Sequence, residues 1–297
     1  MEQKDKNIAL ITGATGYIGS NLSRCLANMG WDVHLLIRPC SKKNLIKDIL
    51  NVVILHEFDG STSNMIKILN DANPTIVFHL ASLFLAQHKS DDIESLIQSN
   101  ITFSTQLVEA MVLNKIYYLI NTGTSWQHYE NCSYNPVCLY AATKQAAEDI
   151  FTFYVETTAL KIVTLKLFDT FGPNDPRNKL IPLLRKIAKQ NVSLDMSPGE
   201  QLIDIVYIDD VINAFLIAAK KLINGDISEG NYAISSGTPI KLKELVEIYE
   251  SVIKQNLSIN WGDKPYRNRE VMVPWNTGES LPGWIPNVSL EEGLRRL

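Results

Sequence analysis

Cysteine is scarce in this sequence, and the four that occur have no metal-ligand spacing. Cys25, Cys40, Cys132 and Cys138 form no CxxC pair and no Cys/His cluster. A chain of 297 residues is also long enough to bury a core without disulfides. We therefore expect reduced thiols and no metal site.

Long apolar runs and an excess of positive charge are missing as well. No segment approaches the roughly 18 apolar residues of a membrane span, and the charged start MEQKDKN leads into a strand-like segment without a signal-peptide core. The 28 basic and 32 acidic residues give a net charge of -4, which disfavours a nucleic-acid or membrane surface as partner. We expect a cytoplasmic protein that binds a small molecule.

What the sequence has instead is a regular alternation of strand and helix patterns in its first half. Apolar β-branched runs such as Ile8 to Thr12 and Thr75 to Leu80 alternate with helical patterns, one of them from about Ile93 to Asn114. This predicts an α/β fold, a Rossmann-type doubly wound parallel sheet. We expect residues 1–168 to form the dinucleotide-binding domain, with segments of about 203–236 returning to it, and 169–297 to form mainly a smaller C-terminal substrate-binding lobe.

A glycine-rich turn, GATGYIG, follows the first predicted strand and opens a predicted helix. Glycine lets the backbone approach a pyrophosphate, which the helix N-terminus attracts. In this context the turn predicts a dinucleotide site that includes Gly13, Thr15, Gly16, Tyr17 and Ile18.

The second strand ends at Arg38, where an acidic residue would hold the adenosine ribose of NAD. A guanidinium instead binds a 2′-phosphate through charge-assisted hydrogen bonds. Arg38, followed closely by Lys42 and Lys43, predicts NADP as the cofactor and makes NAD the less favoured one.

Tyr140 and Lys144 are one helical turn apart and share a helix face. A free tyrosine has a pKa of about 10, and a nearby ammonium favours its phenolate. Lys144 would also bind the nicotinamide ribose, while Tyr140 would protonate a carbonyl oxygen as hydride reaches the carbon. Thr122 in INTGTS is the candidate third group, with Thr124 and Ser125 as neighbours.

These motifs, in this order, resemble the extended short-chain dehydrogenase/reductase (NAD-dependent epimerase/dehydratase) family of nucleotide-sugar enzymes nearly end to end. The resemblance implies catalytic roles for Thr122, Tyr140 and Lys144 and a homodimer formed by the helices at 93–114 and 141–157. The motifs that carry it are GATGYIG, HLAS at His79 to Ser82, Asn100 in its helix, INTGTS, YAATK, LFDTFGP, GEQLIDIVYIDDV and GWIPNVSLEEGLRRL.

The resemblance also implies ligand contacts that spacing alone does not give. Arg267 falls where relatives bind a diphosphate, although Arg269 is also a candidate, and Ile203 stands where many relatives have a diphosphate-binding arginine. Further cofactor contacts are implied at Asp59, Gly60, Leu80, Ala81, Ser82, Asn100, Tyr140 and Lys144. Substrate contacts are implied at Ser82, Thr122, Thr124, Asp169, Asn178, Lys179 and Arg267.

The residues after Thr122 bear on the reaction. Sugar dehydratases of this family have an Asp and a Glu where this chain has Gly123 and Thr124, which cannot act as acid and base, so dehydration is not expected. The catalytic residues alone leave a 4-ketoreductase and a 4-epimerase open.

Two features favour the reductase. Arg38 suits an NADPH that is consumed and released, and several motifs are most similar to the branch of CDP-abequose and CDP-paratose synthases. We expect NADPH-dependent reduction of the 4-keto group of a nucleotide-linked 6-deoxy or 3,6-dideoxy hexose, for surface-polysaccharide (lipopolysaccharide O-antigen) sugars. The alternatives are a 4-epimerase with tightly bound NAD and a non-catalytic NADP-binding regulator, which commonly loses the tyrosine or lysine kept here.

Overall fold

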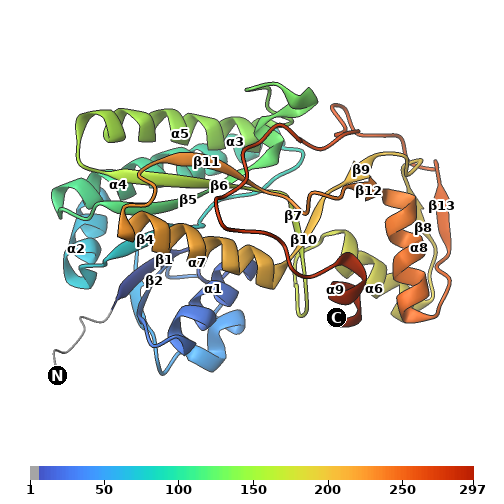
Figure 1. Ribbon diagram of the computed structural model, residues 1–297, viewed down its shortest axis with the longest axis horizontal. Helices are drawn as coiled ribbons and strands as arrows, with labels where there is room; N and C mark the ends of the chain where they lie inside the picture. Colours follow the sequence, from blue (N-terminus) through green and yellow to red (C-terminus); the bar gives the residue numbers. More distant parts are fainter. Residues whose placement is uncertain (1–6) are drawn as a thin grey trace.

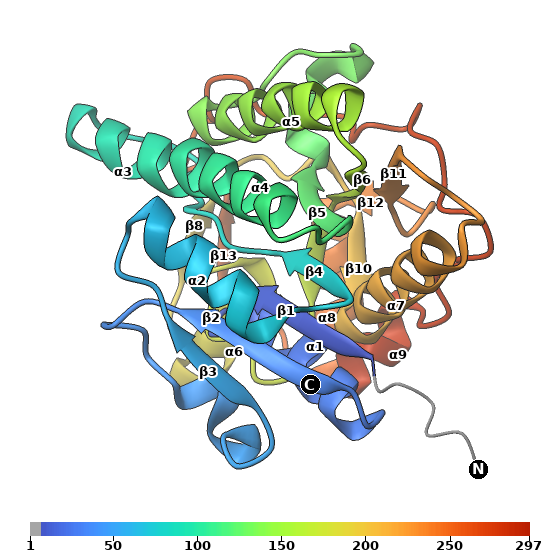
Figure 2. The same ribbon diagram turned by 90° about the vertical axis from the view of Figure 1, so that its left-hand side faces the viewer.

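The computed structural model describes residues 7–297, so most of the charged start, Met1 to Lys6, lies outside the described residues. Its centre is a seven-stranded sheet in the order β11-β6-β5-β4-β1-β2-β3, seen in Figures 1 and 2. Every ladder in it is parallel. The prediction of a Rossmann-type doubly wound sheet is confirmed. Its strands are β1 (Ile8–Thr12), β2 (Asp32–Ile37), β3 (Ile54–Glu57), β4 (Ile76–His79), β5 (Tyr118–Thr124), β6 (Lys161–Leu167) and β11 (Gly230–Ile234).

Helices cover both faces of this sheet (Figure 2). Successive strand residues point to opposite faces, so Leu10 packs with one helical layer while Ala9 and Ile11 pack with the other. Burial on both faces explains the near-continuous apolar strands in the sequence. One layer contains α2 (Thr62–Ala72), α4 (Phe103–Leu113) and α5 (Leu139–Thr157), and the other contains α1 (Tyr17–Asn28) and α7 (Ile208–Asn224).

The chain reverses its direction of travel across the sheet between β1 and β4. Strands β2 and β3 extend the sheet on one side of β1, whereas β4, β5 and β6 extend it on the other. Such a switch point leaves a crevice at the carboxyl ends of the strands, where ligands of doubly wound sheets bind. Both the glycine-rich turn after β1 and Leu80 after β4 lie there.

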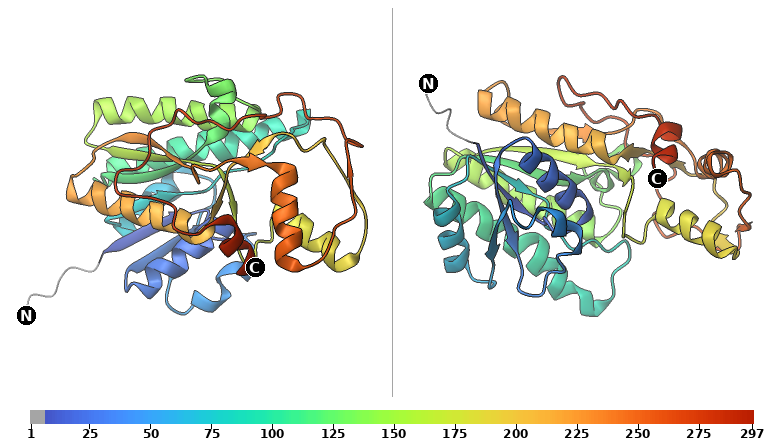
Figure 3. Two further views of the ribbon diagram at one scale, coloured as in Figure 1. Left: turned by 45° about the vertical axis from the view of Figure 1, so that its right-hand side comes forward. Right: turned by 90° about the horizontal axis from the view of Figure 1, so that it is seen from below.

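A second group of short elements lies beyond the end of β6 (Figures 1 and 3). Its strands form three pairs, β7 with β10, β8 with β13 and β9 with β12. The C-terminal segment then returns to the large sheet, where Ala233 N donates to Glu279 O at 2.7 Å. The elements are β7 (Asp169–Phe171), α6 (Leu180–Gln190), β8 (Leu194–Met196), β9 (Leu202–Ile203), β10 (Ile205–Tyr207), β12 (Ile240–Lys241), α8 (Leu242–Ile253), β13 (Ile259–Trp261) and α9 (Leu290–Arg295).

Some local predictions were wrong. The helix expected from Ile93 to Asn114 is interrupted by a π-helical turn, Gln98–Thr102, between α3 (Ile93–Ile97) and α4. The apolar segment of residues 202–207 forms two short strands that divide at Asp204, whose buried carboxylate accepts hydrogen bonds from Ser235 Oγ and Ser236 N. Helix α6 was not predicted, because Pro182 and the Pro- and Asn-rich loop before it favour a turn; proline is tolerated there in the first helical turn.

Short 3₁₀ turns complete the connections, at Asn44–Ile49, Ser90–Asp92, Ser125–Gln127 and Tyr129–Asn131. None of the helices in residues 7–297 combines the length and the apolar character that crossing a membrane requires.

Candidate active site

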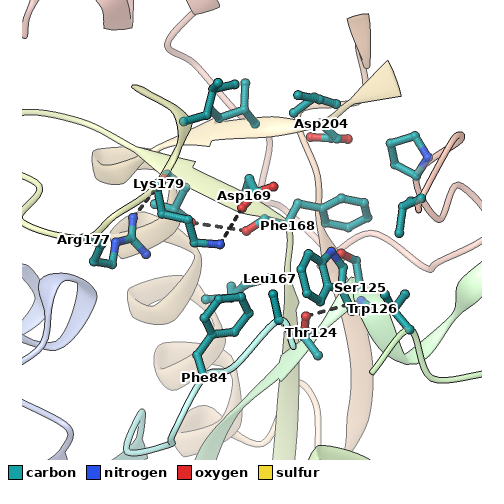
Figure 4. Close-up of a pocket in the computed structure, with 18 of the residues that line it drawn as sticks. Phe84, Thr124, Ser125, Trp126, Leu167, Phe168, Asp169, Arg177, Lys179 and Asp204 are labelled. Atoms are coloured by element: carbon teal, nitrogen blue, oxygen red, sulfur yellow. Dashed lines mark hydrogen bonds and ion pairs between the residues drawn. The ribbon is translucent and has the colours of Figure 1, made fainter. Parts of the chain in front are cut away.

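One cavity of about 550 Å³ opens where the carboxyl edge of the sheet meets the second group of elements. Its walls come from the glycine-rich turn, the ends of β5 and β6, the loop before α6, and the segments around β9 and Trp275. Figure 4 shows the part of the wall that contains Leu167, Lys179 and Asp204. The structure thus brings together residues far apart in sequence. The predicted site residues that line the cavity are Gly13, Gly16, Tyr17, Ile18, Leu80, Ser82, Thr122, Thr124, Tyr140, Asp169, Asn178, Lys179 and Arg267.

The glycine-rich turn has the form that a dinucleotide pyrophosphate requires. Gly13 has a φ of +71°, and a Cβ there would lie 2.6 Å from Ala81 N. Helix α1 starts after Gly16, which provides no side-chain cap, so its first N–H groups remain available to an anion. Thr15 sits within the turn outside the set of lining residues. The turn fits a nicotinamide dinucleotide.

Tyr140 and Lys144 lie in the first turns of α5 and are both buried, with 8% and 3% of their surfaces exposed. Burial raises the pKa of Tyr140 to about 12, against the effect of the Ser82 hydroxyl. Burial lowers the pKa of Lys144 to about 8; Glu148 opposes this shift and Lys166 adds to it. At pH 7 Tyr140 is therefore protonated and Lys144 mostly charged. Burial thus outweighs the lowering of the Tyr140 pKa that a nearby ammonium would give.

Thr122 presents a free hydroxyl at the end of β5. Its Oγ1 is buried and has no hydrogen-bond partner among the described residues, although Thr122 lines the cavity. Buried hydroxyls normally have a partner, and a substrate oxygen would provide one. Thr124 Oγ1 instead accepts a hydrogen bond from Trp126 N at 3.3 Å. Thr124 therefore fixes the turn that carries Trp126.

Aromatic side chains form the wall beside Tyr140. The Phe84 and Tyr140 rings meet edge to face with centroids 5.0 Å apart, and Trp126 lies 5.5 Å from Phe84 (Figure 4). Farther along, Phe168 and Trp275 are stacked, with centroids 6.3 Å apart. Sequence reasoning missed these aromatic residues, because they come from four separate segments and no local motif connects them.

Cations also line the cavity, over the aromatic rings beside Tyr140. Lys179 Nζ lies 3.0 Å from Asp169 Oδ1 and 4.4 Å from the Phe84 ring centre. Arg267 Nη2 lies 2.6 Å from Glu270 Oε1. Arg269 instead binds Asn135 and stacks on Tyr129, outside the lining residues. Between the two arginines, the geometry therefore favours Arg267 as the one that meets a ligand, while Ile203 offers only apolar surface.

Other predicted residues lie away from the lining of the cavity. Arg38 is exposed directly after β2. Asp59 follows β3, where its Oδ1 accepts from Ser61 N at 2.8 Å, and Gly60 has a φ of +99°. Asn100 is buried and donates to Thr143 Oγ1 at 2.9 Å while accepting from Leu83 N at 2.7 Å. Asn100 thus fastens the segment after β4 to α5.

A Rossmann sheet whose glycine-rich turn and buried Tyr140 line one cavity, with Lys144 buried one helical turn along α5, defines a dinucleotide-dependent enzyme. The chain belongs to the NAD dependent epimerase/dehydratase family, whose model matches residues 9–234. This confirms the resemblance inferred from the sequence motifs.

Individual relatives differ in their reactions. The chain is 26% identical over 293 residues to CDP-abequose synthase of Salmonella muenchen, covering 97% of this chain and 96% of that protein. It is 24% identical to UDP-glucuronate 4-epimerase of Thermodesulfobacterium geofontis, covering 97% and 94%. The UDP-glucose 4-epimerase of Thermus thermophilus, solved in complex with NAD, has a TM-score of 0.82 and 21% identity, covering 97% and 96%. That last likeness establishes the fold.

Proposed function

We propose that this chain reduces the 4-keto group of a nucleotide-linked 6-deoxy or 3,6-dideoxy hexose with NADPH, for the synthesis of surface-polysaccharide sugars. The observation that carries the proposal is the pair of hydroxyl groups, from Tyr140 and Thr122, that line the cavity. Among the described residues, it offers a protonated Tyr140 and an unpartnered Thr122 hydroxyl. A carbonyl reduction needs a proton donor and a second hydrogen bond to the same oxygen.

In this proposal each residue acts on a stated atom. Tyr140 gives its phenolic proton to the C4 oxygen, and Thr122 donates a hydrogen bond to that oxygen. Lys144 holds the nicotinamide ribose and stabilises the phenolate that forms. Hydride for carbon 4 is the chemistry that NADPH supplies when bound.

Dehydration is disfavoured because the site has no place for a further acid and base. A Cβ on Gly123 would lie 2.6 Å from Lys166 Cδ, so a carboxylate side chain cannot be added there without displacing a buried lysine. Among the described residues that line the cavity, every carboxylate already has a partner. The pairs are Asp169 with Lys179, Asp204 with Ser235 and Glu270 with Arg267.

The NADP preference is supported by the position of Arg38. Its exposed side chain leaves the carboxyl end of β2, next to the switch point, and Arg38 N donates to Ser41 Oγ at 3.0 Å in the turn that precedes Lys42 and Lys43. Three cations in this short segment favour a 2′-phosphate. NAD is the alternative cofactor, since the similar UDP-glucose 4-epimerase of Thermus thermophilus was solved in complex with NAD.

A 4-epimerase with tightly bound NAD is the second candidate, favoured by the similarity to UDP-glucuronate 4-epimerase. An epimerase must first remove a proton from a 4-hydroxyl, which requires the phenolate. The same Tyr140 would serve in either reaction, so Arg38, which suits a cofactor that is consumed and released, is what favours the reductase. A non-catalytic regulator is disfavoured because Tyr140 and Lys144 are both present and buried, and Tyr140 lines the cavity.

A homodimer formed through the helices of residues 93–113 and 139–157 remains a proposal. The apolar side chains of Ile93, Ile97 and Phe153 are exposed on these helices and would be covered. Light scattering on the purified chain should give twice the monomer mass, and a monomer at micromolar concentration would contradict this.

The function is tested by mixing the protein and NADPH with a panel of 4-keto-6-deoxy and 4-keto-3,6-dideoxy nucleotide sugars. We expect loss of NADPH absorbance with at least one of them. Tyr140→Phe is the matched control and should lower turnover by about 10² to 10⁴ while leaving NADPH binding nearly unchanged. Inversion of a 4-hydroxy nucleotide sugar without added cofactor, together with no NADPH oxidation, would instead establish the epimerase.

A further inference from the structure

A buried ion pair lies behind the catalytic residues, and the proposed reaction does not use it. Glu148 Oε2 on α5 is 2.5 Å from Lys166 Nζ on β6, with side chains only 10% and 2% exposed. Burying two charges costs desolvation energy that their attraction often fails to recover. A contribution to folding stability alone therefore does not explain why the Glu148–Lys166 pair is present.

The pair connects to the strand that carries Thr122. Gln127 is fully buried, and its Nε2 donates to Glu148 Oε1 at 3.1 Å. Gln127 Oε1 accepts from Thr124 N at 3.0 Å, two residues after Thr122. One continuous set of buried hydrogen bonds therefore links β6, α5 and the end of β5.

Lys144 is one helical turn before Glu148, so the two side chains share a face of α5 and could pair. The Glu148 carboxylate is instead engaged by Lys166 and Gln127. The charges that act on Lys144 among the described residues are those of Glu148, which favours its ammonium form, and Lys166, which disfavours it. His79 on β4 is held between Thr12 and Ser104, and burial lowers its pKa, so it is neutral. Tyr140, on the same helix, is protonated.

We propose that Lys166 and Glu148 are positioning residues for Lys144: Lys166 occupies the Glu148 carboxylate and so leaves the Lys144 ammonium free for the cofactor ribose. Glu148 still helps to keep Lys144 charged from one turn away. Without Lys166, the Glu148 carboxylate is free to pair with Lys144 and would draw its ammonium away from the cofactor ribose. The inference rests on the proposed function for the role of Lys144.

The test compares two variants that both lack the Lys166 charge. Lys166→Met leaves Glu148 as a carboxylate, whereas the double variant Lys166→Met with Glu148→Gln replaces it with an amide of nearly the same shape. NADPH binding is followed by nicotinamide fluorescence between pH 6 and 10. In the unaltered protein, binding should weaken as the pH rises through about 8, because Lys144 loses its proton there.

We expect Lys166→Met to bind NADPH about tenfold more weakly at pH 7 and to move the upper pH limit of binding upward by on the order of one unit. The double variant should recover most of the affinity, and its pH limit should fall below that of Lys166→Met. Equal affinities and equal pH limits in the two variants would overturn the inference, since a purely structural pair would not move the limit.

Lys166→Gln, which can still donate to Glu148, replaces Lys166→Met if that variant does not fold, and the same upward shift is expected. If neither Lys166→Met nor Lys166→Gln folds, the ion pair serves only to stabilise the fold, and the inference is overturned. NADPH binding is measured without a sugar. Absence of turnover with every keto sugar would therefore contradict the proposed function without deciding whether Lys166 and Glu148 position Lys144.

Discussion

The Phe84 ring meets the Tyr140 ring edge to face, with centroids 5.0 Å apart, so the wall beside the proposed proton donor is apolar. A sugar whose C4 oxygen reaches Tyr140 must place its neighbouring ring atoms against this wall and Trp126. A hydroxyl that meets only the ring surfaces, away from Lys179 Nζ 4.4 Å from the Phe84 ring centre, would lose its hydration without gaining a partner, which costs about 1–3 kcal/mol. The wall therefore favours a sugar that lacks a hydroxyl next to C4 or at C6.

Replacing Phe84 with alanine should reduce this preference. We expect kcat/KM for the deoxygenated keto sugar to fall by roughly tenfold, because the contact between the sugar and the Phe84 ring is lost, while the hydroxylated analogue is affected less. Steady-state kinetics on the two substrates measures the difference. Tyr117→Ala, an exposed aromatic residue just before β5 and outside the cavity lining, is the control and should change neither value. Equal losses for both substrates would rule out a role of Phe84 in sugar selection.

Arg38→Ala tests the 2′-phosphate contact. The Michaelis constant for NADPH should rise about tenfold, because one charge-assisted hydrogen-bonded contact at an exposed site is lost, whereas that for NADH should hardly change. Lys67→Ala, on the exposed surface of α2, controls for a general loss of positive charge. A similar rise for both cofactors would show that Arg38 does not contact the 2′-phosphate.

Gly123→Ala tests how tightly the end of β5 packs on the buried ion pair. The added Cβ would lie 2.6 Å from Lys166 Cδ and 2.9 Å from Thr164 Cγ2. Such overpacking should lower the free energy of unfolding by about 1–3 kcal/mol. Urea unfolding measures this, with Ser125→Ala as a nearby control that should be almost neutral. An unchanged unfolding midpoint for Gly123→Ala would mean that space for a side chain exists at this position.

A histidine pair on the sheet predicts a loss of stability in acid. His34 Nδ1 and His56 Nε2 are 2.8 Å apart on β2 and β3. Burial lowers the pKa of both rings, and His34 lowers that of His56 further. The neutral pair therefore contributes its full stability above a pH of about 6.5, the ordinary histidine pKa, and loses it as the pH falls.

Between pH 7 and pH 5 the unaltered protein should lose roughly 1 kcal/mol more unfolding free energy than His56→Gln. His79 is present in both proteins, so its own pH dependence cancels in the comparison. Urea unfolding at the two pH values gives the difference, with His88→Gln in an exposed loop as the control. Identical pH dependence in the unaltered protein and His56→Gln would contradict this account.

The sequence predicted what depends on short spacing. The glycine-rich turn and the Tyr140–Lys144 pair are local patterns, and alternating strands and helices determine the sheet. Trp275 and Lys166 could not be placed, because their neighbours in space come from distant segments. The position of Glu148, four residues after Lys144, is visible in the sequence. That Glu148 pairs with Lys166 and not with Lys144 depends on the packing of β6 against α5, which the sequence does not give. Helix α6 was not predicted, because the proline-rich loop before it favours a turn.

The central claim is that hydride passes from NADPH to carbon 4 of a keto sugar. The most direct test uses NADPH labelled with deuterium at carbon 4 of the nicotinamide, on the face that the enzyme transfers, and locates the deuterium in the product by NMR. The account predicts one deuterium at sugar carbon 4 for each NADPH oxidised. A product inverted at carbon 4 that carries no deuterium, with the NADPH unchanged, would contradict it.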